Sequence, residues 1–294
     1  MDCPPPQPDL PETEPAPPAK HVAPAAEHDT RETLRYRAPG SGVIAELLRL
    51  QSAAPTRSRM QRVFGRSPLT VDSRTWYLGA LGELEVARVL DLLGPGWSAV
   101  HALPVGELGS DIDHLVIGPA GVYTVNAKFH QQASVWVGGK RILVNGRRTD
   151  HLRNAEFEAR RAAKLLSLAA GRRVEVTPIL AIVAARRITL RERPLHVLVT
   201  SSHDLPRLLL SRPPLLTGDE AAELHDLAAT PATWGRATAP AADLGALADL
   251  RMSIERARGR RTAWKILGAL ALMFGPLVAV WAGMLNVAVW SSVF

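Results

Sequence analysis

The sequence predicts an α/β protein in which a mixed β-sheet is flanked by helices. Three observations support this prediction. A helical stretch precedes a group of short apolar runs, a second long helical stretch follows that group, and two further apolar runs come after it. Helices and strands that alternate in this way pack as layers, with helices on the faces of a sheet. At 294 residues and 47% hydrophobic content, the chain is large enough for a sizeable core.

The expected elements follow in chain order from their periodicity and from their stop signals. A possible helix at 42–53 precedes a helix at 73–93, which Gly94-Pro95-Gly96 ends. Asp150 is a candidate N-cap for a helix at 151–170, and Gly171 is its stop. The predicted strands are 98–103, 112–117, 122–128, 134–137, 141–144, 178–184 and 196–200, and two short helices are predicted at 203–211 and 217–228.

Composition divides the chain into four expected parts. Residues 1–41 form an arm rich in proline and alanine, without a periodic apolar run, and they are expected to be disordered. Residues 42–229 form the globular domain. Residues 230–262 are a linker that ends in a basic segment, and 263–291 form one transmembrane helix.

The membrane prediction depends on the apolar sequence near the C-terminus. No charged residue occurs from Ile266 onward, and six basic residues lie just before this point (Arg251, Arg256, Arg258, Arg260, Arg261 and Lys265). Basic residues favour the cytoplasmic side of a membrane, so we expect a single-pass protein with a cytoplasmic domain. A lipid bilayer is therefore an expected partner, and the alternative is a hydrophobic core helix with a basic cap.

Charge and cysteine content set limits on the possible partners and sites. The net charge is +7, part of which belongs to the basic segment before the predicted membrane helix. A second basic patch, Arg57, Arg59, Arg62 and Arg66, either contacts nucleic acid phosphates or is a solvated helix face. Cys3 is the single cysteine, so the sequence contains neither a disulfide framework nor a thiolate metal site.

A predicted β-hairpin at 112–128 carries the side chains that suggest chemistry. Gly118-Pro119-Ala120-Gly121 is typical of a tight turn, and a two-residue loop would place Ile117 opposite Val122. Counting outward puts Asp113 opposite Asn126 and Asp111 opposite Lys128, all four on one face. A register shift of one residue would separate this cluster.

Glu83 is the second unusual position. A projection of the helix at about 100° per residue places it within the apolar arc that contains Val86, Ala87 and Leu90. A carboxylate that faces a core needs a hydrogen bond, an ion pair or a metal ion. Glu83 is therefore either a residue that hydrogen-bonds nearby backbone or part of a site with the hairpin.

Acidic residues on strands with a lysine close by are what a metal-dependent phosphodiester hydrolase requires. The sequence resembles the nuclease-related domain (NERD) family, a branch of the restriction-endonuclease-like PD-(D/E)xK superfamily. The resemblance rests on GALGE at 79–83, IDHLVI at 112–117 with its Gly-Pro turn, and VNAK at 125–128, and it spans about 74–170. It implies a restriction-endonuclease-like fold for the domain.

By position, the resemblance implies that Asp113 is the principal metal ligand, Lys128 the catalytic lysine and Glu83 a supporting acid. Glu158 stands where such domains often have a polar helix residue. The sequence departs from the family pattern at Asn126, where an acidic metal ligand is usual. Asp111 is a possible supporting residue, because it is expected to project from the same face.

The resemblance implies a nuclease that hydrolyses phosphodiesters of DNA or RNA with Mg²⁺ or Mn²⁺, and the predicted membrane helix makes it a membrane-tethered protein with a cytoplasmic domain. The alternative is a degenerate NERD module that binds nucleic acid or a protein without catalysis, because an amide at 126 weakens the binding of a hard cation. A third alternative is that the hairpin residues form only a structural ion-pair network.

Overall fold

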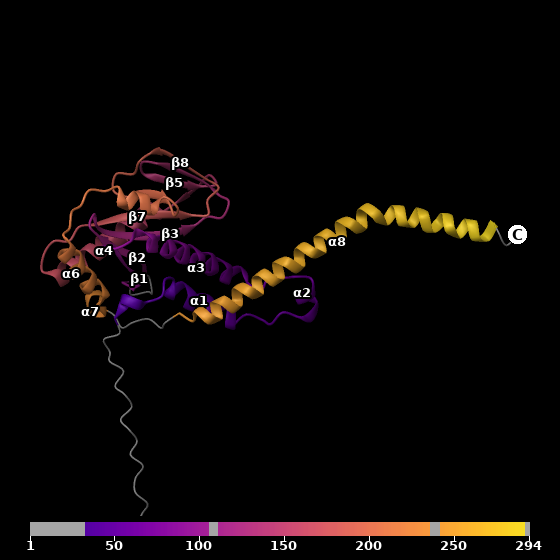
Figure 1. Ribbon diagram of the computed structural model, residues 1–294, viewed down its shortest axis with the longest axis horizontal. Helices are drawn as coiled ribbons and strands as arrows, with labels where there is room; N and C mark the ends of the chain where they lie inside the picture. The colour runs from indigo at the N-terminus through magenta and orange to yellow at the C-terminus, as the bar shows by residue number, and fades with distance from the viewer. Residues whose placement is uncertain (1–32, 106–110, 236–241, 292–294) are drawn as a thin grey trace, which may run out of the picture. The chain divides into compact units, whose positions relative to one another are not determined.

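The computed structural model describes residues 33–105, 111–235 and 242–291, and its side chains are described as far as residue 281, except 278 and 279. Within this part the chain is α/β, as the sequence predicts, and it has two mixed sheets flanked by helices (Figure 1). Most of the predicted N-terminal arm lies outside the described residues.

The first sheet has five strands in the order β1-β2-β3-β7-β9. Strands β1, β2 and β3 pair antiparallel, and β3, β7 and β9 pair parallel. Parallel neighbours need a crossover connection, and the one between β3 and β7 includes the long helix α4, His151–Ala170. The strands are β1 Ser98–Pro104, β2 Asp111–Gly118, β3 Gly121–Phe129, β7 Val176–Val183 and β9 Leu198–Ser201.

The single sheet that the sequence predicts is wrong: the predicted strands 134–137 and 141–144 belong to a second sheet of four strands, and its other two strands, β6 and β8, are not predicted by the sequence. The order of this second sheet is β6-β5-β4-β8. The segments after β3 and after β7 leave the first sheet side by side, because His130 N–H donates to Val183 and Gln132 N–H to Ala184. Gln132 and Ala184 both have positive φ, which turns the two segments together. The strands are β4 Ser134–Gly138, β5 Arg141–Val144, β6 Arg147–Thr149 and β8 Arg187–Glu192.

Two long helices cover opposite faces of the five-stranded sheet. Alternate residues of the strands divide between them: Leu115 and Val122 share a core with Leu166 of α4, while Val116 and Val125 pack with Leu90 of α3. This division follows from the two-residue period of a strand. These helices are α3 Val71–Leu90, which ends in the short η2 Asp91–Leu93, and α4 His151–Ala170.

The shorter helices complete the two cores. Leu205 and Leu209 of α5 pack on the α3 face, and Leu224 of α6 packs on the α4 face. Thr217 caps α6 through its side chain, as the sequence pattern of a capping box requires. The remaining elements are η1 Leu34–Tyr36, α1 Ser41–Ser52, α2 Arg59–Val63, α5 Leu205–Leu210, α6 Gly218–Ala229, α7 Pro231–Trp234 and α8 Leu244–Ser291.

The expected linker at 230–262 differs from the structure. Trp234 is 3% exposed and donates its indole N–H to the carbonyl oxygen of Ala228. Helix α8 begins at Leu244, and Leu247 and Leu250 pack with Ile44 of α1. Alanine, proline and threonine are frequent at 230–250 and indicate a linker, but alanine and leucine from Leu244 onward also favour a helix, and tertiary packing determines the outcome. Leu34, within the expected arm, is likewise buried.

Helix α8 contains the sequence predicted to cross a membrane. The helical conformation is confirmed to Ser291. Within the described residues, we found no helix whose length and apolarity meet the requirements of a membrane span. This finding does not support the predicted span at 263–291, of which the side chains at 282–291 lie outside the described part.

Candidate active site

The β2–β3 hairpin has the predicted turn and register. Pro119 and Ala120 form the two-residue loop, Gly118 pairs with Gly121, and Ile117 pairs with Val122. Gly121 has φ +117°, a conformation that side chains other than glycine rarely adopt. The hairpin prediction is therefore confirmed from the turn outward.

The ladder between the two strands ends one residue before Asp113. The last antiparallel pair is His114 with Val125, and beyond it the Asp113 carboxylate accepts a hydrogen bond from the Ala127 backbone N–H at 2.8 Å. A side-chain oxygen thus binds the amide of the neighbouring strand where the ladder stops. The predicted pairing of Asp113 with Asn126 lies just past this point. Asp113 is held in place by β3, next to Asn126.

Asn126 interacts with helix α4 through its amide nitrogen. Its Nδ2 donates to both carboxylate oxygens of Glu158, at 2.8 and 2.7 Å. An ionised carboxylate can only accept hydrogen bonds. The amide of Asn126 must therefore turn its nitrogen, and not its oxygen, toward Glu158. Asn126 is 3% exposed, and its Oδ1 has no hydrogen-bond partner among the described residues. A buried oxygen without a hydrogen-bond partner destabilises the fold unless a ligand binds to it.

Glu83 faces the core, as the helix projection predicts, and it is 6% exposed. Its carboxylate accepts a hydrogen bond from the backbone N–H of Gly40, which precedes α1. The preceding residue, Gly82, allows α3 to approach the end of β3. A Cβ atom added there would lie 3.3 Å from the Cβ of Phe129. This close approach brings Glu83 into electrostatic range of the hairpin.

The charges of the cluster influence one another strongly. Burial raises the pKa of Asp113, while Lys128 and the hydrogen bond from Ala127 oppose this change. Burial raises the pKa of Glu83 well above its usual value, the charge of Asp113 raises it further, and Lys128 lowers it. Lys128 is thus a cation within electrostatic range of both carboxylates. Two partly desolvated acids beside one ammonium group favour the binding of an additional cation.

Asp111 lies at the start of β2, and residues near the N-terminal end of the domain contact its side chain. Its carboxylate lies 3.8 Å from the guanidinium of Arg37, and it contacts Gly42 so closely that a Cβ atom there would overlap it. The charge of Asp111 raises the pKa of Glu83, so Asp111 is near the cluster. Sequence reasoning missed Arg37 and Gly42, because no local pattern links either residue to a strand 70 positions later.

Two histidines lie beside Lys128 and extend the cluster beyond the predicted residues. The Nε2 atoms of His130 and His151 are 3.1 Å apart. Burial lowers the pKa of both rings and the charge of Lys128 lowers it further, to about 4 for His151. The pair is therefore neutral near pH 7, with one ring donating to the other. His130 follows β3 and His151 begins α4, and their proximity depends on the fold.

Glu158 gives a prediction about pH and stability. Burial raises its pKa from the usual 4.5 to about 7, and the charge of Asp113 adds to this. At a pH between 4.5 and about 7, Glu158 keeps its proton in the folded state but has lost it in the unfolded state. The contribution of Glu158 to the free energy of unfolding therefore falls as pH rises through this range. The full shift corresponds to about 3 kcal/mol at roughly 1.36 kcal/mol per pKa unit.

We therefore expect the metal-free wild type to lose more stability, or gain less, than Glu158→Gln when pH rises from 5 to 8, as chemical denaturation measures. Glutamine keeps an acceptor for Asn126 but does not titrate, so the difference between the two proteins isolates the contribution of Glu158. Glu156→Gln, on the same helix, is the matched control. Equal pH dependence in wild type and Glu158→Gln would show that Glu158 does not titrate in this range.

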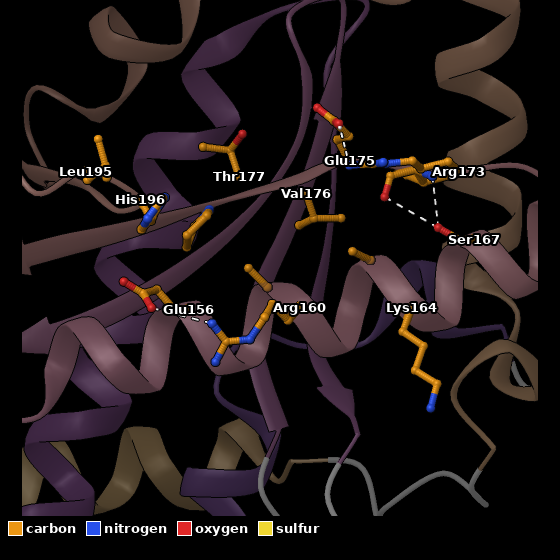
Figure 2. A pocket seen from close by; sticks show the side chains of 14 residues that line it. Glu156, Arg160, Lys164, Ser167, Arg173, Glu175, Val176, Thr177, Leu195 and His196 are labelled. Atoms are coloured by element: carbon orange, nitrogen blue, oxygen red, sulfur yellow. Dashed lines mark hydrogen bonds and ion pairs between the residues drawn. The ribbon is translucent and has the colours of Figure 1, made fainter.

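A separate hollow of about 700 Å³ lies along α4 and the start of β7 (Figure 2). Arg160 pairs with Glu156 and Arg173 with Glu175 in its wall. It lies near the N-terminal end of β7, whereas Asn126 pairs with Leu180 toward the other end of that strand. The hollow is therefore distinct from the carboxylate cluster, and we base the chemistry on the cluster.

The donor atoms of the cluster suit a hard divalent cation. No group of three or more His, Cys, Asp or Glu side chains within the described residues is placed to hold a metal ion. The oxygens that fit are of mixed type: the Asp113 carboxylate, the partnerless amide oxygen of Asn126, and Glu83 as a supporting carboxylate. Mg²⁺ commonly takes few protein ligands, keeps several waters and binds substrate phosphate oxygens. This donor set is consistent with such a cation.

The family comparison gives the class, the PD-(D/E)xK-like nucleases. Within this class, residues 78–183 match the family described as Nuclease-related domain, NERD. The chain therefore contains a NERD domain, as the sequence motifs indicated. The match includes α3 from Leu78, the whole hairpin, α4 and β7. We found no significant match among curated proteins or among solved structures.

Proposed function

We propose that this protein is a nuclease that hydrolyses phosphodiester bonds of nucleic acid with Mg²⁺ or Mn²⁺. The observation that carries the proposal is the arrangement at the open end of the β2–β3 hairpin. There, two acids with raised pKa values lie within electrostatic range of one lysine, and an amide oxygen has no partner within the described structure. The NERD match supports nucleic acid as the substrate class.

Each residue of the cluster has a distinct role in this proposal. Asp113 and the Oδ1 of Asn126 would hold the cation, with Glu83 as the supporting acid. When bound, such a cation lowers the pKa of water and offsets charge on the phosphoryl group. The ammonium of Lys128 hydrogen-bonds a phosphate oxygen or the attacking water and stabilises the negative charge that develops during attack. Asp111 acts through the charge it adds near Glu83.

Glu158 places an acidic group beside Asn126, where the family pattern has an acid on the strand itself. The family pattern places an acid at position 126, and here the acid is on α4, with both of its oxygens bound to the Asn126 amide. The hydrogen bond polarises the amide and so strengthens its oxygen as a ligand. This pairing supports activity despite the departure at Asn126, because an acidic group stays next to the amide that would bind the cation.

The test is cleavage of nucleic acid by the purified full chain. Labelled single-stranded and double-stranded DNA and RNA are incubated with Mg²⁺, with Mn²⁺ or with a chelator. We expect cleavage of at least one substrate that requires the metal and is lost in Asp113→Ala. Cleavage that persists in the chelator, or in Asp113→Ala, would exclude this site as its source.

The second candidate function is a NERD module that binds nucleic acid without cleaving it. The observation that favours it is the same Asn126–Glu158 pair, because a neutral ligand at position 126 binds a hard cation less tightly. Metal-independent binding of nucleic acid by the wild type, with no cleavage under any metal condition, would favour this function over hydrolysis.

The location of the activity stays a prediction from the sequence. The apolar sequence at 263–291 predicts membrane attachment with the domain in the cytoplasm, and the described structure does not support a span. Fractionation of cells that express the full chain tests this prediction: release into the soluble fraction without detergent would contradict it.

A further inference from the structure

Two basic segments that are distant in sequence meet where α2 packs against α8 (Figure 1). A small hollow of about 180 Å³ is lined at this contact by Arg57, Arg62, Ser253, Arg256, Ala257 and Arg260. Four of these six lining residues are arginines, and none is acidic. The volume holds a phosphate group with a few waters, at roughly 30 Å³ per water molecule.

The contact between α2 and α8 is closely packed. Gly65, after α2, has φ +70°, and a Cβ atom there would lie 2.4 Å from the carbonyl oxygen of Ala257. Arg260 donates to the carbonyl oxygen of Arg62, and Arg57 donates to the hydroxyl of Ser253. The arginines therefore converge because the backbone and the hydrogen bonds hold the two segments together.

This convergence is electrostatically unfavourable without an anion. Partial burial lowers the pKa of Arg57, and the charges of Arg62, Arg260 and Arg256 lower it further. Guanidinium groups present planar sets of donors that match phosphate oxygens. A bound phosphate would offset the mutual repulsion of the four side chains.

The side chains next to the hollow indicate the source of the phosphate. Trp264, one turn after Arg260, packs against Phe64 with ring centroids 5.1 Å apart and donates to the carbonyl oxygen of Val63. Phe64 is 50% exposed and Trp264 42%. The side chains that follow on α8 are also exposed and apolar: Ile266, Leu267, Leu270, Leu272, Met273, Phe274 and Leu277. The side chains along this part of the protein change from arginines to aromatic rings and then to apolar side chains. At a membrane surface, these three types contact the lipid headgroups, the interface and the acyl chains, respectively.

We propose that the hollow formed by Arg57, Arg62, Arg256 and Arg260 binds the phosphate of an anionic phospholipid headgroup, with Phe64 and Trp264 at the lipid interface. Nucleic acid also carries phosphates, but its sugar-phosphate backbone has no apolar surface that would contact the exposed aliphatic side chains of α8. The inference is independent of the proposed nuclease activity, because none of these residues belongs to the carboxylate cluster.

The test compares binding of the full chain to phosphatidylcholine vesicles with and without phosphatidylglycerol. The quantity measured is the ratio of the two affinities, which separates the contribution of the anionic headgroup from apolar association. The variant is Arg62→Ala with Arg256→Ala, because Arg57 and Arg260 also hold α2 against α8. We expect this ratio to fall by about fivefold for each arginine removed.

The control is Arg191→Ala with Arg193→Ala, which removes the same charge from exposed positions in and after β8. It should leave the ratio nearly unchanged. Three results would overturn the proposal: no preference of the wild type for phosphatidylglycerol, an equal loss in both double variants, or weaker binding of nucleic acid with unchanged vesicle binding. Circular dichroism of both variants confirms that the fold is intact.

Discussion

Replacement of Lys128 by methionine should lower the rate of cleavage by about 10²–10³ while nucleic acid still binds. Methionine keeps much of the length and apolar stem of lysine but removes the cation within electrostatic range of both Asp113 and Glu83. The loss of one group that stabilises developing charge commonly lowers kcat by about 10²–10³. Single-turnover cleavage with saturating enzyme measures this effect separately from affinity.

Lys140→Met is the matched control for this experiment. Lys140 is an exposed lysine between β4 and β5, so the variant has the same change in net charge. Its cleavage rate should equal that of the wild type. A Lys128→Met protein that cleaves at the wild-type rate would show that Lys128 takes no part in the chemistry.

Exchange of the acid and the amide between positions 126 and 158 should preserve function better than either single change. Asn126→Asp alone removes the donor of two hydrogen bonds and places two carboxylates within hydrogen-bonding distance of each other. One of the two must then hold a proton, and the pair loses on the order of 1–3 kcal/mol of stability. The addition of Glu158→Gln restores a donor opposite the new acid.

Thermal unfolding and cleavage of the two single variants and the double variant measure this coupling. We expect Asn126→Asp to be the least stable of the four proteins above pH 7, and the double variant to regain the metal-dependent activity of the wild type. Additive effects of the two changes would show that the two side chains are not coupled. A single Asn126→Asp variant more active than the wild type would show that the amide is a lost ligand.

The hairpin was predictable because its turn chemistry and its register are local. Pro119 and the flanking glycines define a two-residue loop, and this loop fixes the register as far as the pair His114–Val125. The burial of Glu83 also followed from a local pattern, the period of its helix.

The partners of these residues were not predictable, because they come from distant segments. Glu158 reaches Asn126 across 32 positions, and Arg37 reaches Asp111 only after the chain before α1 folds back. The separation of the strands into two sheets has the same cause. Short apolar runs indicate strands but contain no information on pairing, and the parallel pairs β3–β7 and β4–β8 decide the architecture.

A calorimetric titration of the metal-free full chain with Mn²⁺ tests the central claim most directly. Asp113→Asn is the informative variant, because asparagine retains an oxygen for the Ala127 N–H and removes only the charge. If Asp113 and Asn126 form a cation site, the wild type binds Mn²⁺ and Asp113→Asn binds it at least tenfold more weakly, with the fold unchanged. Equal binding by the two proteins, or no binding by the wild type, would contradict this account.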